Sequence, residues 1–143
     1  MTDPSLLRPL ESFDARAITG VLTDIDDTLT QDGRLPAAVY TMLERLAQAG
    51  LAIVPVTGRS AGWAHLILHH WPVEAVVAES GGITLYRDSA HRPQRLWHDD
   101  PVRISDDRAR IAKAAAAVLH EIPELVLAND NDFRLVDFAI DHS

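Results

Sequence analysis

The sequence predicts an α/β fold built on a parallel sheet, and two observations support this. Over residues 18–79, buried apolar runs alternate with amphipathic stretches in the order strand, helix, strand, helix, strand, which is typical of right-handed crossovers between parallel strands. The polar clusters "DIDDT", "TGRS" and "ESGG" each follow one of the three predicted strands. Because ligands bind beyond the carboxyl ends of such strands, we expect the three clusters to converge on one site.

The first half of the chain contains clear start and stop signals for its elements. The predicted strands are residues 18–25, 51–56 and 73–79, and the predicted helices are residues 36–50 and 60–71. The first helix has apolar side chains at helical spacing, Pro36 at its first position and Gly50 just past its end. The second helix ends at Trp71, since the residue before a proline disfavours helical backbone.

The pattern changes after Gly82, where antiparallel elements are predicted. The runs "ITLYRD" and "QRLWHD", separated by "SAHRP", indicate a β-hairpin near residues 83–98. A helix over residues 105–122 is expected to begin with Ser105 as its N-cap and to stop before Pro123. Two antiparallel strands are then predicted over residues 124–128 and 133–141, and the second of them alternates well between apolar and polar residues.

Composition narrows the class of protein. The 143 residues suit one domain, and 47% hydrophobic with 24% charged residues are typical of a soluble globular protein. No apolar run could span a bilayer, and the start (residues 1–17) is polar and interrupted by prolines, which favours a cytoplasmic protein. A net charge of −8 argues against nucleic acid or an anionic membrane as a partner. The absence of cysteine excludes disulfides, thiolate zinc sites and cysteine nucleophiles.

The acidic cluster after the first strand indicates a cation site. Asp24 and Asp26 can both point into one pocket if the chain leaves the sheet in a tight loop, and carboxylates this close repel unless something neutralises them. A hard cation such as Mg²⁺ suits these oxygen ligands, and it would reconcile an acidic chain with a small phosphorylated substrate. One carboxylate could attack phosphorus, and the other could protonate the leaving oxygen and later activate water.

The second cluster offers groups for a phosphate. Thr57 has a hydroxyl and a backbone N–H for a phosphoryl oxygen, and it could cap the next helix as well. Gly58 lets the chain approach closely, and the N-terminus of the following helix favours an anion. Arg59 is either an ion-pair partner or a substrate ligand. Ser80 and Gly81 are either turn residues or phosphate contacts.

Together these segments resemble a known family. The runs "DIDDTLT" and "VTGRS" look like the first two motifs of the haloacid dehalogenase (HAD) superfamily of phosphatases. The run "VAESGG" resembles a segment of the subgroup with a C2-type cap, which includes sucrose-, trehalose- and mannosyl-phosphoglycerate phosphatases. The resemblance implies a HAD-like core over residues 1–100, including the hairpin near residues 83–98. It also implies a partial C2-type cap over residues 101–143, because "RLVDFAID" resembles an early cap strand.

The resemblance implies a role for each site residue. Asp24 would be the nucleophile that forms an aspartyl-phosphate and would hold Mg²⁺, and Asp26 would be the acid and base, with its backbone carbonyl also on Mg²⁺. Thr57 would hold the phosphoryl group. The remaining candidate substrate contacts are Thr28, Gly58, Arg59, Ser80 and Gly81. The implied activity is Mg²⁺-dependent hydrolysis of a phosphomonoester, with a phosphorylated sugar as the expected substrate.

The family also carries a lysine and a second acidic pair after the cap. We expect this chain, which ends at Ser143, to be an amino-terminal portion that lacks them. In an alternative capless protein, Lys113 with Asp130 and Asp132 would be degenerate versions of these motifs. Two other functions stay open. One is a catalytically incomplete fragment that binds metal or phosphate weakly, or dimerises through an exposed sheet edge. The other is a phosphomutase-type phosphotransferase.

Overall fold

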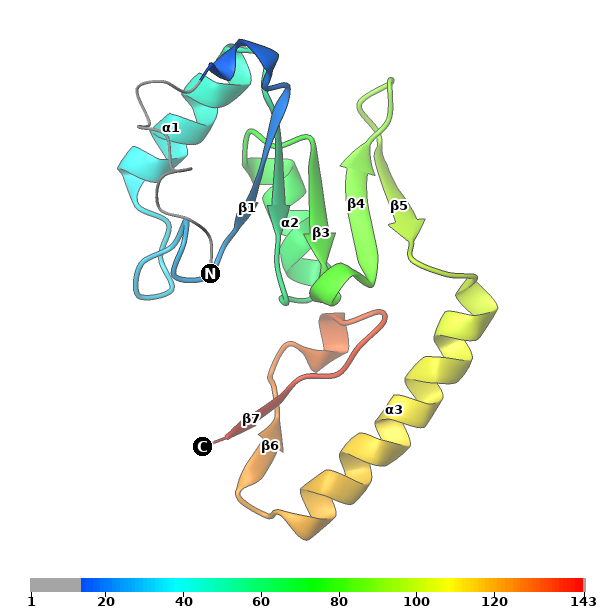
Figure 1. Cartoon of the computed structure of the whole chain (residues 1–143). Coiled ribbons are helices and arrows are strands. Elements are labelled where there is room, and N and C mark those ends of the chain that lie inside the picture. The colour runs from blue at the N-terminus through cyan, green and yellow to red at the C-terminus, as the bar shows by residue number, and fades with distance from the viewer. Residues whose placement is uncertain (1–13, 143) are drawn as a thin grey trace, which may run out of the picture.

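The computed structural model describes residues 14–142 (Figure 1). The first thirteen residues of the predicted lead-in, and Ser143, lie outside the described residues. The strands are β1 (Gly20–Asp24), β2 (Ala52–Val56), β3 (Ala75–Ala78), β4 (Ile83–Arg87), β5 (Pro93–Trp97), β6 (Leu125–Leu127) and β7 (Ile140–His142). The helices are α1 (Ala37–Gln48), α2 (Ala61–His70) and α3 (Pro101–Glu121), with 3-10 turns η3 (Ala15–Ala17), η4 (Glu79–Gly81) and η5 (Asn131–Phe133).

The main sheet has five strands in the order β1-β2-β3-β4-β5. The first three strands are parallel, and β4 and β5 form the predicted antiparallel hairpin. Asp24 is in register with Val56, and Val56 is in register with Val77, so the three carboxyl ends are level. The α/β prediction is confirmed, and the loops that follow β1, β2 and β3 meet at one edge of the sheet.

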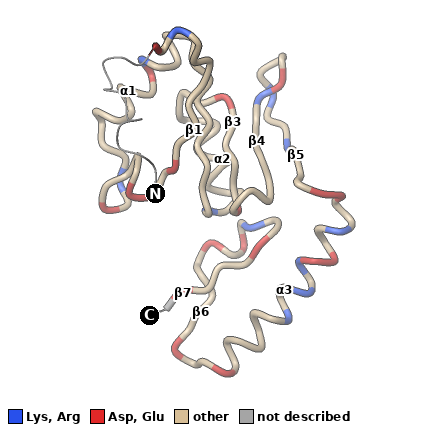
Figure 2. Tube along the Cα trace, in the orientation of Figure 1, with Lys and Arg blue, Asp and Glu red and all other residues tan. Residues whose placement is uncertain are grey.

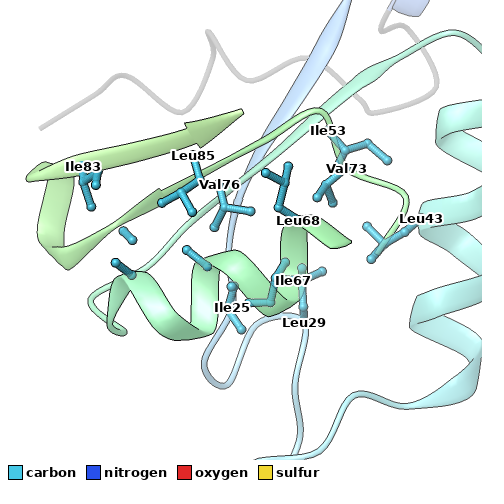
Figure 3. Close-up of a cluster of buried hydrophobic side chains, with 13 residues drawn as sticks. Ile25, Leu29, Leu43, Ile53, Ile67, Leu68, Val73, Val76, Ile83 and Leu85 are labelled. Carbon is cyan, nitrogen blue, oxygen red and sulfur yellow. The ribbon is translucent and has the colours of Figure 1, made fainter. Parts of the chain in front are cut away.

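Both crossover helices cover the same face of this sheet. The strand order advances in one direction, and right-handed crossovers then place α1 and α2 together. Figure 3 shows Ile67 and Leu68 of α2 beside Val76 of the sheet, with Leu43 reaching in from α1. Fully burying an aliphatic side chain of this size contributes about 1.5–3 kcal/mol. On the edge strand β1, by contrast, Leu22 is 74% exposed.

Helix ends follow the predicted signals closely in the first half of the chain. Gly50 has a φ of +81° and donates its N–H to the Ala47 carbonyl, which closes α1 as expected. Pro36 is the N-cap of α1 and not its first helical residue. Trp71 is the C-cap of α2, directly before Pro72. No helix in the described part of the chain is long and apolar enough to cross a membrane.

The start of α3 was predicted wrongly. The helix begins at Pro101, four residues before Ser105, the expected N-cap. The Asp100 side chain accepts the N–H of Val102 at 2.8 Å, and a proline at the first helical position is already preorganised for helix. Asp100 and Pro101 therefore start the helix, and Ser105 lies inside it. In Figure 1, α3 runs from the end of β5 along one side of the C-terminal segment.

The predicted strand over residues 133–141 is also wrong. Only Ile140 onward forms a strand, β7, which pairs with β6, and residues 131–133 form the 3-10 turn η5. The extended residues 134–139, here called the returning segment, pair with no strand of the main sheet. Three successive backbone N–H groups of this segment, those of residues 135–137, are satisfied instead by one side chain.

That side chain is Glu79, which is only 3% exposed. Its carboxylate accepts the N–H groups of Leu135 at 2.9 Å, Val136 at 2.6 Å and Asp137 at 3.0 Å. It also accepts the N–H of Ala61 at 2.9 Å, at the start of α2. One buried carboxylate thus joins the turn after β3, the helix α2 and the returning segment, an arrangement that we call the Glu79 clamp.

Two glycines let the C-terminal residues approach the core. A Cβ on Gly62 would lie 2.7 Å from the Phe133 Cβ, and one on Gly82 would lie 2.8 Å from the Val136 Cγ1. Such distances exclude a side chain without local movement. Gly82 belongs to the quoted "SGG" run, so its role here is close packing beside the clamp.

We expect Glu79→Ala to lower the free energy of unfolding by about 3 kcal/mol, because it leaves four backbone N–H groups without their acceptor. Urea denaturation measures this loss, and limited proteolysis should show earlier cleavage in the returning segment. Glu74→Ala is the matched control, because Glu74 is an exposed glutamate directly before β3, the strand that Glu79 follows. Equal stabilities of the two variants would contradict the clamp.

Candidate functional site

Asp24 lies at the end of β1 and opens the first loop of the site. Its Oδ2 accepts a hydrogen bond from the Thr28 hydroxyl at 3.0 Å. The buried side chains of Ile25 and Leu29 anchor this loop to the core, and the Ile25 carbonyl accepts the N–H of Leu29. Asp26, Asp27 and Thr28, which lie between these two anchors, are exposed. Thr28, a candidate substrate contact, thus orients the Asp24 carboxylate.

Asp26 is held by Arg59 from the loop after β2. The Arg59 Nε donates to both carboxylate oxygens of Asp26, at 2.9 and 3.0 Å, and a terminal guanidinium nitrogen donates as well. This hydrogen-bonded pairing raises the pKa of Arg59. The guanidinium also lies over the ring of Trp63, with 4.9 Å between the Cζ and the ring centroid. Of the two roles left open for Arg59, the structure shows the ion pair.

Thr57 is only 3% exposed, directly after β2. Its hydroxyl accepts the N–H of Arg59 at 3.1 Å, so it caps the turn itself. The Thr57 N–H is donated to the Val77 carbonyl at 2.9 Å, so the expectation that this N–H is offered to a phosphate is wrong. The hydroxyl hydrogen is still a donor toward the loops, since a hydroxyl donates once while it accepts.

The N-terminus of α2 was also expected to favour a bound anion. In the structure the Glu79 carboxylate accepts the N–H of Ala61, the first residue of the helix. A side chain of the protein therefore already supplies negative charge at this end of the helix dipole. A phosphate at the site would depend on the loop side chains more than on α2.

The third cluster forms a strained turn beside Gly58. Glu79 and Ser80 have φ values of +50° and +55°, and Gly81 has +98°. The Ser80 N–H donates to the Thr57 carbonyl at 3.3 Å, and its Oγ would lie 3.7 Å from a Cβ on Gly58. Left-handed backbone at two consecutive non-glycine residues is costly and needs surrounding support, which the clamp supplies. The turn brings Ser80 and Gly81 next to the Gly58 loop.

A polar cavity of about 500 Å³ lies between the loops after β1 and β2 and the C-terminal residues. Asp24, Thr57, Ser80 and Gly81 are not among the residues that line it. Its lining residues are Asp26, Gly58, Arg59, Trp63, Ala128, Asn129, Asp130, Arg134, Ala139 and Asp141. The returning segment, residues 134–139, contributes two of them. A cavity of this size falls in the range of small-molecule sites.

Arg134 holds the returning segment against the Gly58 loop, and the sequence analysis assigned it no role. It is 8% exposed, and it donates to the Gly58 carbonyl at 3.1 Å and to the Asp137 Oδ1 at 2.8 Å. Its Nε donates to the Asp130 Oδ1 at 3.0 Å. The pKa of Asp137 is raised, chiefly because of burial and although Arg134 opposes the shift. For Asp130, burial alone would raise the pKa, but the hydrogen-bonded pairing with Arg134 opposes burial and the pKa is lowered.

The alternative set of catalytic groups is brought together only in part. Asp130 lines the polar cavity with Asp26, whereas Asp132 is exposed on η5 and lines no part of it. Lys113 is exposed on α3 and is also not among the cavity residues. Figure 2 shows charged positions of both signs interspersed along α3, as expected for a solvated helix face. The structure therefore offers no lysine at the cavity.

The donors near Asp24 fit a water-rich Mg²⁺ better than a closed metal site. Among residues 14–142, no group of three or more acidic, histidine or cysteine side chains is arranged to hold a metal. Both carboxylate oxygens of Asp26 accept from Arg59, whereas the described residues give the Asp24 carboxylate a hydrogen bond from Thr28. Mg²⁺ commonly binds through one or two carboxylates and keeps several waters.

We expect Asp130→Asn to destabilise the chain by about 1–3 kcal/mol at neutral pH, because it weakens a buried pairing with Arg134. Folding lowers the pKa of Asp130 from 3.8. The Asp130 carboxylate therefore contributes its full stabilisation of the folded state above pH 3.8, and this stabilisation is lost as the pH falls through the lowered pKa. Urea denaturation over this range measures the difference from the unmodified chain. Asp132→Asn is the control on the same turn, and a difference that does not shrink in acid would contradict the pairing.

The comparisons with known proteins agree with this geometry. The sequence profile of the haloacid dehalogenase-like hydrolases matches residues 21–115, which is most of the chain and includes all three loops of the site. No curated protein matches the sequence.

Solved structures share the fold over part of their length. A phosphatase of the HAD enzyme superfamily from Bacteroides thetaiotaomicron is 22% identical, with a TM-score of 0.50 over 86% of this chain and 41% of that one. A protein described as hypothetical from Geobacillus kaustophilus is 20% identical, with a TM-score of 0.52 over 77% of this chain and 39% of that one. This chain thus spans less than half the length of either structure. Its fold is the HAD-like α/β fold, and the chain belongs to the haloacid dehalogenase-like hydrolase family.

Proposed function

We propose that the chain carries the nucleophile half of a phosphomonoester hydrolase site. The observation that carries this proposal is the register of β1 and β2, which sets Asp24 opposite Val56 and hence beside Thr57. A carboxylate nucleophile and a phosphate-binding hydroxyl then follow adjacent strands at one edge. The family match supports hydrolase chemistry, and a phosphatase is among the structures that share the fold.

In the proposed reaction, an Asp24 carboxylate oxygen attacks the phosphorus of the ester, and the bond from phosphorus to the leaving oxygen breaks. Asp26 gives its proton to that oxygen. It then takes a proton from water, which attacks the phosphorus of the aspartyl-phosphate and releases inorganic phosphate. Donation by Asp26 requires its carboxyl to turn away from the Arg59 guanidinium, so rearrangement of this pair is part of the proposal.

Mg²⁺ is the cation that we propose for Asp24 and Asp26, where it would offset the negative charge of the phosphoryl group. Thr28 orients the Asp24 carboxylate in this scheme through its hydroxyl. Thr57 would donate its hydroxyl hydrogen to a phosphoryl oxygen, with Gly58 and the turn at Ser80 and Gly81 closing the phosphate pocket.

A phosphorylated sugar is the substrate class that we propose, with residues 1–100 as the core and residues 101–143 as part of a C2-type cap. The polar cavity between the two parts supports this choice, since Asn129, Asp130 and Asp141 line it and suit hydroxyl groups. The net charge of −8 disfavours nucleic acid and anionic membranes as partners of the proposed cytoplasmic enzyme.

A second candidate is an incomplete site that binds metal or phosphate weakly, or that is completed by another chain. It is favoured by the lack, in the described part of the chain, of a third acidic ligand beside Asp24 and of a lysine at the cavity. Under this candidate, a second copy could pair with the free edge of β1, where Leu22 is exposed.

We expect Asp24→Asn to lower phosphate release from an aryl phosphate in Mg²⁺ by at least about 100-fold, because the amide is a poor nucleophile of nearly the same volume. Asp27→Asn is the matched control, since Asp27 is exposed in the same loop at a φ of +58°, which asparagine tolerates. Equal turnover by the two variants would remove Asp24 as the nucleophile. No turnover by the folded, unmodified chain would favour the second candidate.

We expect Thr57→Ala to weaken the binding of inorganic phosphate about 10-fold, through loss of a hydrogen bond to a charged group, and Thr57→Ser to restore it. Isothermal titration of the Mg²⁺-loaded chain with phosphate measures this affinity. If affinity is unchanged in Thr57→Ala, the hydroxyl serves only the turn that it makes with Arg59.

A further inference from the structure

A second cavity, of about 470 Å³, adjoins the polar one. Its lining residues are Ser60, Gly62, Trp63, Leu66, Asn129, Asp130 and Phe133. Trp63, Asn129 and Asp130 line both cavities, so the two hollows share a wall. The second one contains no other charged side chain, and we call it the apolar cavity.

Three large apolar side chains of the apolar cavity remain open to solvent. Trp63 is 44% exposed, Leu66 is 48% exposed and Phe133 is 62% exposed. Trp63 and Leu66 lie one helical turn apart on α2, and the Phe133 side chain packs over Gly62 between η5 and the helix. Such a cluster beside convergent polar groups is typical of a ligand site.

Trp63 stands at the boundary of the two cavities. The Arg59 guanidinium lies over its ring and lines only the polar cavity. We infer that the apolar cavity is lined by a part of the Trp63 indole that the Arg59 guanidinium does not cover. A ligand held at the Gly58 loop could extend past Arg59 and reach this indole surface, because Trp63 lines both cavities.

We propose that the apolar cavity binds a ring in the leaving group of a phosphate monoester, and that Trp63 is the surface on which the ring stacks. The phosphate end of this ligand rests on the function proposed above. The shared chemistry is a six-membered ring with an apolar face, which both an aryl group and a pyranose possess. Asn129 at the junction is placed to meet ring hydroxyls, which an aryl group lacks.

Size and continuity favour a small ring over a macromolecular partner. The cavity volume lies within the range of sites that enclose small ligands. Its shared lining residues, Trp63, Asn129 and Asp130, join it to the polar cavity, which reaches the Gly58 loop of the proposed phosphate pocket. Stacking of an aromatic side chain with a ring typically strengthens binding about 3- to 10-fold.

The test compares ring-bearing with ringless ligands in the full chain loaded with Mg²⁺. Isothermal titration with phenyl phosphate, glucose 6-phosphate, glycerol 3-phosphate and inorganic phosphate reports binding, whether or not turnover occurs. The variants are Trp63→Ala and, as a matched control, Leu96→Ala, which truncates an exposed apolar side chain on β5 outside both cavities.

We expect Trp63→Ala to weaken phenyl phosphate and glucose 6-phosphate about 3- to 10-fold and to change the two ringless ligands less than 2-fold. Weakening of phenyl phosphate alone would assign the cavity to aryl groups, and weakening of both would include sugars. An equal loss for all four ligands would overturn the proposal, because the effect would then act through Arg59. Phosphate binding with no preference for rings would overturn it while leaving the proposed function intact, and no binding at all would contradict both.

Discussion

The Glu79 carboxylate is the interaction on which the rest of the site depends. It occupies the N-terminus of α2 and accepts three successive N–H groups of the returning segment. That contact draws the C-terminal residues over the core, so that Arg134 reaches the Gly58 carbonyl. Both cavities are lined partly by these residues and partly by the core loops. A single buried carboxylate thus fixes the returning segment, residues 134–139, against the loops at the carboxyl ends of the strands.

The carboxylates of Asp24 and Asp26 have different hydrogen-bond partners. Asp24 presents its carboxylate at the strand end with support from Thr28, whereas Asp26 is tied to Arg59, which in turn lies over Trp63. Ligand binding that engages Arg59 or Trp63 would therefore act on Asp26 through direct contacts. This coupling links the polar and apolar cavities to the group that we propose as acid and base. The substrate would then influence its own proton donor.

Much of the core, and the meeting of the three loops at the carboxyl ends of its strands, could be predicted. Hydrophobic periodicity can be read from neighbouring residues, and parallel strands align their carboxyl ends in a regular way. The β1 to β3 elements and the convergence of Asp24 with Thr57 followed from them. The strand expected over residues 133–141 failed because alternation does not reveal that a distant glutamate takes the N–H groups. Glu79 stood inside the quoted "VAESGG" run, and an acidic residue directly after a buried strand was the available signal. Arg134 gave none, because its near partners Asp130 and Asp137 are also what an exposed ion pair would offer, and its distant partner is a backbone carbonyl, that of Gly58.

The most direct test of the central claim is mass spectrometry of the acid-quenched chain after incubation with phenyl phosphate and Mg²⁺. The account predicts one phosphoryl group on the peptide that contains Asp24, and its absence in Asp24→Asn. Phosphate release without a phosphoryl group on that peptide, or a phosphoryl group on another residue, would contradict Asp24 as the nucleophile.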